Sequence, residues 1–294
     1  MNILVIVTAD SYVRSAVMIT KDLHLTEARF GFWGNFYSAI IIENLCKKYC
    51  INNKNALIFT LEKELIEKYD QIILAVGNSY VNKFFSFLYN NFQKKTNRPI
   101  IISIFAGAIF EDTNSILCRL NSDYLFVNSA KDLIKAKALK KETASRCEII
   151  SYGFSTLKDQ KAESCLKNTI CFIDQVKFPK TKTERVYVLK CLIRLAKLYP
   201  NFKIILIKRG RIGEKTVHKN SIPYDRLLKT FKTIPSNFSI QAADIESSIQ
   251  NMRLCISLSS TVLFEAWMNG ISGVAIKDFG IRDEYYTCLL YTSD

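Results

Sequence analysis

The sequence predicts an α/β protein of two Rossmann-like lobes, with parallel sheets and helical crossovers. Short β-branched apolar runs alternate with longer stretches in which apolar residues recur at helical spacing. One polar segment without either pattern, Ser151–Lys167, interrupts this alternation, and we interpret it as a linker. A chain of 294 residues is long enough for two domains. We therefore place one lobe at residues 1–167 and a second at residues 168–287.

In the first lobe, each strand prediction rests on a short apolar run bounded by polar residues. The predicted strands are Ile3–Thr8, Ala56–Thr60, Gln71–Val76, Ile100–Ile104, Tyr124–Val127 and Glu148–Ile150. Each helix prediction rests on apolar residues that return every three or four positions. The predicted helices are Tyr12–Lys21, Phe36–Tyr49, Leu61–Lys68, Val81–Lys94 and Ala130–Lys140.

The second lobe repeats the same alternation of patterns. Its predicted strands are Thr169–Asp174, Lys203–Lys208, Phe238–Gln241, Leu254–Leu258 and Gly273–Ile276. Its predicted helices are Thr183–Tyr199, Pro223–Phe231, Asp244–Gln250 and Thr261–Asn269. Ligands of open α/β sheets bind beyond the carboxyl ends of the strands. We therefore expect the loops after these strands to line a cleft between the lobes.

The bulk composition excludes several classes of protein. Glycine and proline are scarce, which excludes collagen-like and disordered chains. No segment approaches the apolar length needed to span a bilayer. The start of the chain, Met1–Asp10, has no basic leader and turns polar within the length of a strand, so it is interpreted as a first strand and not as a signal peptide. We expect a cytoplasmic protein.

The cysteines and histidines do not suggest a metal site. The nine cysteines are scattered and never form a C-x-x-C pair, and the only histidines are His24 and His218. Cys46 and Cys50 share a helical face and are expected to pack as buried thiols. We expect no metal–thiolate site and no structural disulfide.

The formal net charge of +14 predicts an anionic partner. A nucleotide, a phospholipid headgroup, an acidic glycan or a nucleic acid would each satisfy it. The lysines are spread along the chain without an arginine-rich tract or an aromatic-interleaved patch. We therefore expect no nucleic acid partner.

The final residues, Cys288–Asp294, look like the translation of a transposon-type sequencing adapter. Our hypothesis is that native sequence stops near Thr287 and that the true protein continues further. Sequencing of the complete gene tests this hypothesis. The tail is left out of the fold prediction.

The strongest local signal is the run of hydroxyl residues Ser259, Ser260 and Thr261, between a buried strand and a helix. Their hydroxyls and the free N–H groups of the helix suit an anion such as phosphate. A plain N-cap is the alternative, but it explains only one of the three. Glu265 follows Thr261 at i,i+4 spacing, where its carboxylate suits a ribose diol, or is simply an acid favoured by the helix dipole.

A second cluster spans Lys208–His218, directly after the predicted strand Lys203–Lys208. Its cations and two glycines suit a diphosphate, and a guanidinium such as that of Arg211 gives bidentate contacts. A charged surface turn is the alternative. His218 is placed to protonate or bind a leaving phosphate.

Three further loops carry candidate residues. Gln175 follows a strand where its amide would read a nucleobase or sugar edge. Asp10 follows the first strand and is either a general base for an acceptor hydroxyl or a helix N-cap. Ala106–Ala108 would permit close backbone approach to a ligand, or form a plain tight turn.

Taken together, the segments resemble a bacterial family of uncharacterised glycosyltransferases with two Rossmann-like lobes, the GT-B type. The first-lobe features of the resemblance are Ala9–Ser11, Arg98–Ile102 leading to Gly107, Arg119, and Asp123–Phe126. Those of the second lobe are Phe172–Gln175 with Pro179, Glu184–Arg185, Tyr199–Pro200, Lys208 with Arg211, Glu214, Thr216 and His218, Ser259–Thr261 with Glu265–Ala266, and Asp278–Gly280. The chain departs from the family by having Ala106 in place of a proline, and it lacks the family's carboxy-terminal part. The motifs around Ser259–Glu265 and Lys208–His218 are also similar, more loosely, to capsule and lipo-oligosaccharide transferases that use CMP-activated acidic sugars.

The resemblance implies a transferase with an acceptor side in the first lobe and a donor nucleotide in the second, incomplete lobe. By this resemblance, Ser259, Ser260 and Thr261 bind phosphate, Lys208 and Arg211 neutralise the charge of the leaving nucleotide, and His218 assists its departure. Glu214 orients His218 or Lys208, and Thr216 and Glu265 make further donor contacts. Gln175 contacts the base or ribose, and Asp10 is the general base.

No metal and no cofactor are expected beyond a nucleotide-sugar substrate, CMP- or UDP-linked. The acceptor would be a surface polysaccharide or lipid-linked glycan, reached by peripheral binding at the inner membrane face. Two alternatives stay open, since the fold hosts many activities: a sugar-nucleotide epimerase, and a non-catalytic protein that binds a phospholigand or nucleic acid.

Overall fold

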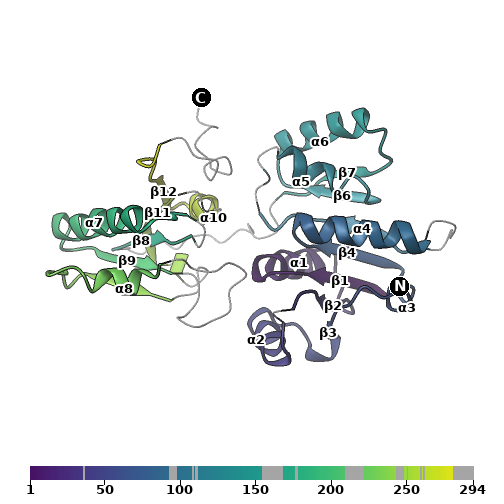
Figure 1. Ribbon diagram of the computed structural model, residues 1–294, viewed down its shortest axis with the longest axis horizontal. Coiled ribbons are helices and arrows are strands. Elements are labelled where there is room, and N and C mark those ends of the chain that lie inside the picture. The colour runs from purple at the N-terminus through teal and green to yellow at the C-terminus, as the bar shows by residue number, and fades with distance from the viewer. Residues whose placement is uncertain are drawn as a thin grey trace. The chain divides into compact units, whose positions relative to one another are not determined.

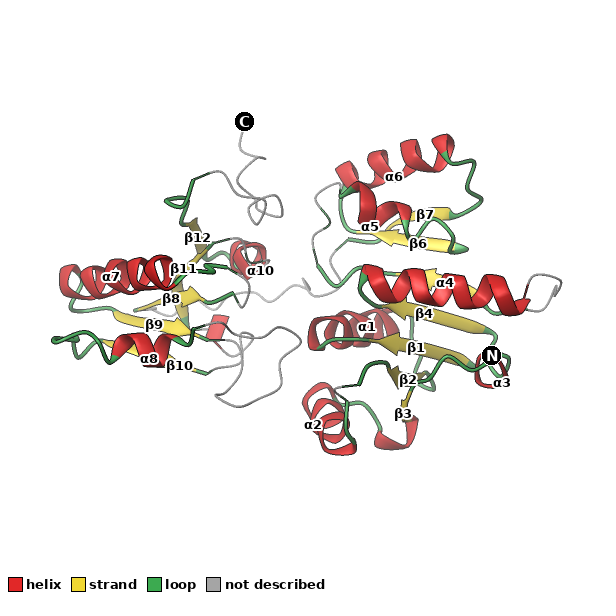
Figure 2. Ribbon diagram, in the orientation of Figure 1, coloured by secondary structure: helices red, strands yellow, loops and turns green. Residues whose placement is uncertain are grey.

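The computed structural model shows two compact units, Met1–Thr156 and Leu157–Asp294, each with its own parallel sheet (Figures 1 and 2). The division falls within Ser151–Lys167. The residues that the structure describes are 1–35, 37–92, 98–107, 109, 112–153, 168–175, 178–208, 222–242, 248–249, 251–258, 260 and 262–280. Among them, no helix is both long and apolar enough to cross a membrane.

The first unit contains a seven-stranded sheet in the order β3-β2-β1-β4-β5-β6-β7. Every neighbouring pair of strands in it is parallel. The strands are β1 (Ile3–Val7), β2 (Arg29–Phe32), β3 (Ala56–Ile58), β4 (Gln71–Ala75), β5 (Ile100–Ser103), β6 (Tyr124–Val127) and β7 (Glu148–Ser151). The α-helices are α1 (Asp10–Asp22), α2 (Ala39–Tyr49), α3 (Lys63–Ile66), α4 (Asn78–Phe92), α5 (Thr113–Leu117) and α6 (Ala130–Glu142), with a short 3-10 turn at Asn53–Asn55.

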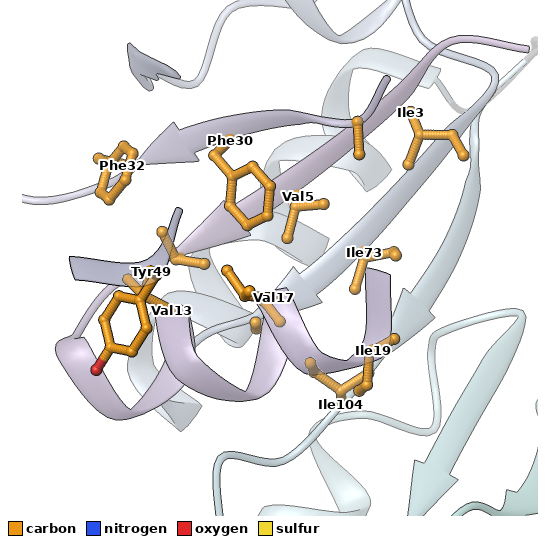
Figure 3. Close-up of a cluster of buried hydrophobic side chains, with 14 of the residues drawn as sticks. Ile3, Val5, Val13, Val17, Ile19, Phe30, Phe32, Tyr49, Ile73 and Ile104 are labelled. Carbon is orange, nitrogen blue, oxygen red and sulfur yellow. The ribbon is translucent and has the colours of Figure 1, made fainter. Parts of the chain in front are cut away.

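Alternation along β1 divides the core of the first unit between the two faces of the sheet. Ile3, Val5 and Val7 pack with residues of α1 and α2. Figure 3 shows Ile3 and Val5 above Val13, Val17 and Ile19 of α1. Leu4 and Ile6 point to the opposite face, where α3 and α4 cover them. Both faces are therefore buried, which is why the strand is apolar at every position.

The second unit contains a five-stranded parallel sheet in the order β10-β9-β8-β11-β12. The strands are β8 (Thr169–Ile173), β9 (Lys203–Ile207), β10 (Phe238–Gln241), β11 (Met252–Ser257) and β12 (Ser272–Ala275). Its helices include α7 (Lys182–Leu198), α8 (Tyr224–Leu228) and α10 (Val262–Met268). α7 and α8 cover one face of the sheet, and α10 covers the other.

These two sheets confirm the predicted fold of two Rossmann-like α/β lobes. β6 and β10 have the predicted bounds, and the other predicted strands differ from the observed ones by one or two residues at an end. The predicted helix Asp244–Gln250 lies mostly outside the described residues. Cys46 is buried as expected, but Cys50 is exposed, so the prediction of a second buried thiol was wrong.

The sequence patterns missed two elements of the first unit, β2 and α5. In β2 the apolar run is short and is broken by Gly31, so it does not stand out as a strand. A Cβ at Gly31 would lie 3.0 Å from Cβ of Phe59, so close packing against that ring requires the glycine.

Candidate functional site

Each sheet has one point where the chain order reverses, and ligands of such sheets bind outside the strand ends at that point. In the second unit the reversal lies between β8 and β11, which are neighbours at the centre of the sheet. The Ser257 hydroxyl donates to the Ile173 carbonyl at 2.9 Å, which ties the ends of these two strands together. The Asp174 N–H donates to the Ile207 carbonyl of β9, also at 2.9 Å. The loops after β8, β9 and β11 therefore start at one edge of the sheet.

Of the three predicted hydroxyl residues after β11, the structure describes Ser260 alone, and Ser259 and Thr261 lie outside the described residues. Ser260 is buried, and its hydroxyl accepts a hydrogen bond from the Val262 N–H at 3.3 Å. Its carbonyl accepts another from the Leu263 N–H at 3.0 Å. Ser260 lies two residues before α10 and binds its first N–H group, which is part of the capping role that the sequence left open beside phosphate binding; the N-cap position itself lies outside the described residues.

Glu265 lies in α10 and is half-buried. Burial raises the pKa of the Cys255 thiol to about 12, and the neighbouring Cys171 and Glu265 add to this rise. The Glu265 carboxylate therefore lies close enough to β11 for its charge to raise the pKa of Cys255.

Lys208 follows β9 and is held by a carboxylate. Its Nζ lies 2.6 Å from Oδ2 of Asp225 in α8, and both side chains are partly buried. Its backbone N–H donates to the Gln241 carbonyl of β10 at 2.9 Å. The Lys208 ammonium is thus fixed at the carboxyl edge of the sheet. The other members of this predicted cluster, Arg211, Glu214, Thr216 and His218, lie outside the described residues.

The loop after β8, which carries Gln175, is shaped by the fully buried Arg185 of α7. The Arg185 guanidinium donates from Nε to the Pro179 carbonyl at 2.9 Å and from a terminal nitrogen to the Gln175 carbonyl at 3.2 Å. Its other terminal nitrogen lies 3.6 Å from the carboxylate of Asp174, which is also buried. The same guanidinium stacks on the Tyr224 ring, 4.7 Å from its centroid. One buried cation therefore fixes both ends of the loop.

This buried cluster was not identified from the sequence, where Arg185 entered only as part of the resemblance. Burial raises the pKa of the Tyr224 hydroxyl and the Asp174 charge adds to the rise, while Arg185 opposes it, so Tyr224 stays a neutral phenol. The available signal was Asp174 at the end of an apolar strand, because a carboxylate there needs a buried partner.

In the first unit the reversal lies between β1 and β4. Asp10 is the first residue of α1, so Ala9 and not Asp10 occupies the N-cap position. The Tyr49 hydroxyl donates to Oδ1 of Asp10 at 3.0 Å, and the Lys48 ammonium lies 3.3 Å from Oδ2. Burial and the Asp10 charge raise the pKa of Tyr49, so the phenol keeps its proton and holds the carboxylate. The Asp10 side chain remains 56% exposed and accessible to a substrate.

The loop after β5 is pinned by side chains of other loops and helices. The Ser15 hydroxyl of α1 donates to the Ala106 carbonyl at 3.2 Å, and the Asn128 amide donates to the Gly107 carbonyl. Ala108 lies outside the described residues. Within the part of the chain that the structure describes, no three His, Cys, Asp or Glu residues lie together so that they could hold a metal ion.

Comparisons with known proteins agree with this architecture. Residues 54–294 match the sequence model of the family described as "Putative glycosyltransferase (DUF6716)". No curated protein is significantly similar to the chain.

Several solved structures have the same fold at low sequence identity. UDP-GlcNAc 2-epimerase from Neisseria meningitidis, bound to UDP-GlcNAc, is 14% identical with a TM-score of 0.63, over 97% of this chain and 85% of that one. Arabidopsis thaliana UGT89C1, complexed with UDP, is 12% identical with a TM-score of 0.58, over 93% of this chain and 79% of that one. Anabaena Alr3699/HepE, in complex with UDP-glucose, is 15% identical with a TM-score of 0.55, over 94% and 80%.

Proposed function

This chain belongs to the glycosyltransferase family whose model matches residues 54–294, and we propose that it binds its nucleotide-sugar donor at the carboxyl edge of the second unit's sheet. The observation that carries this proposal is that Gln175, Lys208 and Ser260 follow the neighbouring strands β8, β9 and β11 at one edge of the sheet, beside the reversal point between β8 and β11. A reversal point is where open α/β sheets bind nucleotides.

Lys208 is proposed to bind the diphosphate of the donor. Charge grows on the leaving nucleotide as the glycosidic bond breaks, and a fixed cation stabilises that charge without reorganisation. The Asp225 carboxylate holds the Lys208 ammonium in place. When the donor binds, the ammonium is shared between this carboxylate and the diphosphate. Arg211 and His218, which follow in the sequence, are proposed to assist this step. A metal ion is not required if these groups supply the positive charge.

Gln175 is proposed to read the base or ribose. Arg185 binds the carbonyls of Gln175 and Pro179 and so holds both ends of this loop, which lowers the conformational entropy lost when a base docks against Gln175. UDP is our preferred nucleotide, since UDP or a UDP-sugar is bound in the three similar structures above. CMP remains the alternative that the sequence motifs suggest.

Asp10 of the first unit is proposed as the general base for the acceptor hydroxyl. Its carboxylate is exposed, and Tyr49 and Lys48 hold it in one orientation. The net charge of +14 supports an anionic acceptor, either a surface polysaccharide or a lipid-linked glycan reached from the inner membrane face.

Nucleotide binding tests the donor site. Among UDP, CMP, GDP and ADP, we expect UDP to raise the thermal unfolding temperature most. At about 100 times its Kd, UDP should add about 2.7 kcal/mol to the free energy of unfolding. Lys208→Ala removes a hydrogen bond to a charged group and should weaken UDP binding about 10- to 100-fold. Lys208→Ala is a cleaner variant than Ser260→Ala, because loss of the α10 cap would itself cost about 1 kcal/mol.

The matched control is Lys229→Ala, which removes an exposed lysine just after α8. Its UDP affinity should equal that of the unmodified chain. If Lys208→Ala and Lys229→Ala bind UDP equally well, Lys208 is not part of the donor site. If no nucleotide stabilises the folded chain, the donor proposal itself is wrong.

Product analysis separates a transferase from an epimerase, since epimerases share the fold. Incubated with UDP-GlcNAc and no acceptor, a transferase should leave the C2 configuration of the sugar unchanged and release at most a little free sugar. Exchange of deuterium from solvent into C2, followed by proton NMR, would instead identify an epimerase.

A further inference from the structure

Arg119 is a fully buried cation at the carboxyl edge of the first unit's sheet. One terminal nitrogen donates to the Val76 carbonyl at 2.6 Å, and the other donates to Oδ1 of Asn78 at 2.7 Å and to the Ser115 carbonyl at 2.9 Å. Its Nε is buried and makes no hydrogen bond. Among the described residues, no carboxylate lies within ion-pair distance of it.

The described groups that contact Arg119 are all neutral. Burial raises the pKa of the Tyr12 hydroxyl and of the Cys118 thiol, and the Arg119 charge offsets these rises only in part. Both therefore keep their protons at neutral pH. The nearest carboxylate in the hydrogen-bond network is that of the exposed Asp112, which reaches Arg119 only through Ser115 and Asn78. The guanidinium charge is therefore solvated by dipoles and not balanced by an ion pair.

The second unit shows how this protein balances a buried arginine elsewhere. Arg185 occupies the comparable edge of its own sheet, and the buried carboxylate of Asp174 lies 3.6 Å from it. A buried charge without a counter-charge destabilises the fold, because no ion pair offsets the free energy needed to remove the ion from water. No carboxylate of the described residues offsets this cost for Arg119, and this favours an anion close to the edge of the first sheet.

The N-terminus of α4 lies directly at Arg119, whose terminal nitrogens bind the residues on either side of Gly77. α4 is 15 residues long, so its dipole is fully developed. Tyr80 and Val81 donate their N–H groups to the Gly77 carbonyl, and the N–H groups of Asn78 and Ser79 donate to no described residue. The space beside Gly77 is open, since a Cβ there would meet nothing within 4 Å. Two N–H groups without an acceptor among the described residues, a helix dipole and a buried cation thus lie around Gly77.

We infer that the first unit binds an oxyanion, a phosphate or carboxylate, at the N-terminus of α4, held by the N–H groups of Asn78 and Ser79 with Arg119 behind them. That this oxyanion belongs to the acceptor rests on the proposed transfer reaction. Asp10, at the same sheet edge, is paired with Lys48 and not with Arg119.

The test uses the full chain labelled with ¹⁵N-glycine, which has ten glycine signals. UDP is kept saturating so that anions do not occupy the donor site, and sodium chloride keeps the ionic strength constant. The probes are inorganic phosphate, glucose 6-phosphate, glucuronate and uncharged glucose. Gly77→Ala identifies the Gly77 signal, and the open space around that position should let the variant fold.

We expect phosphate to move the Gly77 signal in a saturable manner and to leave Gly273, in the second unit, unmoved. Glucose 6-phosphate or glucuronate should act in the same way, and the stronger of the two identifies the acceptor's anion. Glucose should not. Ser79→Asp places a carboxylate at the first turn of α4 and should weaken phosphate binding about tenfold or more by charge repulsion. Ser86→Asp makes the same change on an exposed residue of the same helix and should have no effect.

A Gly77 signal that does not move, or equal binding by Ser79→Asp and Ser86→Asp, overturns the site. If inorganic phosphate binds but neither glucose 6-phosphate nor glucuronate does, the assignment of this site to the acceptor is wrong. Failure of the proposed function looks different, because the chain would then show no nucleotide binding while the Gly77 response to anions remained.

Discussion

Replacement of Asp10 by asparagine is expected to lower kcat for sugar transfer by about 10²- to 10⁴-fold, the usual contribution of a general base. The amide keeps the size of the side chain and still accepts the Tyr49 hydrogen bond, but it cannot take a proton from the acceptor hydroxyl. Because Asp10 belongs to the first unit, UDP affinity should stay unchanged. Initial rates at saturating donor and acceptor, together with a UDP titration, measure both quantities.

Glu43→Gln is the matched control for Asp10→Asn, since it removes one negative charge from α2 on an exposed side chain paired with Lys47. It should leave kcat unchanged. Tyr49→Phe should give a smaller loss than Asp10→Asn, because the carboxylate remains and loses only one orienting hydrogen bond. If Asp10→Asn transfers sugar at the unmodified rate, Asp10 has only the structural role seen in its contacts with Tyr49 and Lys48.

Replacement of Arg185 by methionine is expected to destabilise the second unit by about 3–5 kcal/mol. The change leaves the Asp174 carboxylate buried without its cation and frees the carbonyls of Gln175 and Pro179 from their donor. Urea unfolding followed by circular dichroism measures the loss. Fluorescence of Trp33, which packs between Phe59 and Tyr80 in the first unit, should show an unchanged transition for that unit when it is measured in a Trp267→Phe background that removes the tryptophan of the second unit.

Two further variants separate the buried charge from other effects of the Arg185 substitution. Arg253→Met makes the same replacement at an exposed position of β11 and should cost little. The double variant Asp174→Asn/Arg185→Met removes both charges and should be more stable than Arg185→Met alone. A single Arg185→Met variant as stable as the unmodified chain would mean that the Asp174 contact contributes nothing.

The loops around the candidate site show where prediction from the sequence succeeded. A polar residue directly after an apolar strand lies at the carboxyl edge of a parallel sheet, whatever the order of the strands. Asp10, Gln175 and Lys208 could be placed at such edges for this reason, and they lie there. The spacing after β11 likewise predicted that Ser259 or Ser260 would cap the next helix, and Ser260 binds the first N–H of that helix from two residues before its start.

The partners of these residues could not be predicted, because they come from distant parts of the chain. Asp10 meets Tyr49 across 39 positions, and Lys208 meets Asp225 across 17. Helical patterns do not specify which helix end will face a given loop. Arg119 and Arg185 were hidden for another reason: an arginine in a polar-looking stretch is most often exposed, so neither was expected to be buried.

The sequence by itself determined the alternation of strands and helices, the parallel direction of the strands and the division into two lobes, because periodicity and connection length follow from local chain geometry. Only the tertiary structure decided the order of the strands within each sheet, and with it the reversal points at β1/β4 and β8/β11. It also decided that the buried Arg185 has a carboxylate partner, whereas the buried Arg119 has none among the described residues. Strand order and charge balance depend on which distant segments meet, and this is settled by packing of the whole chain.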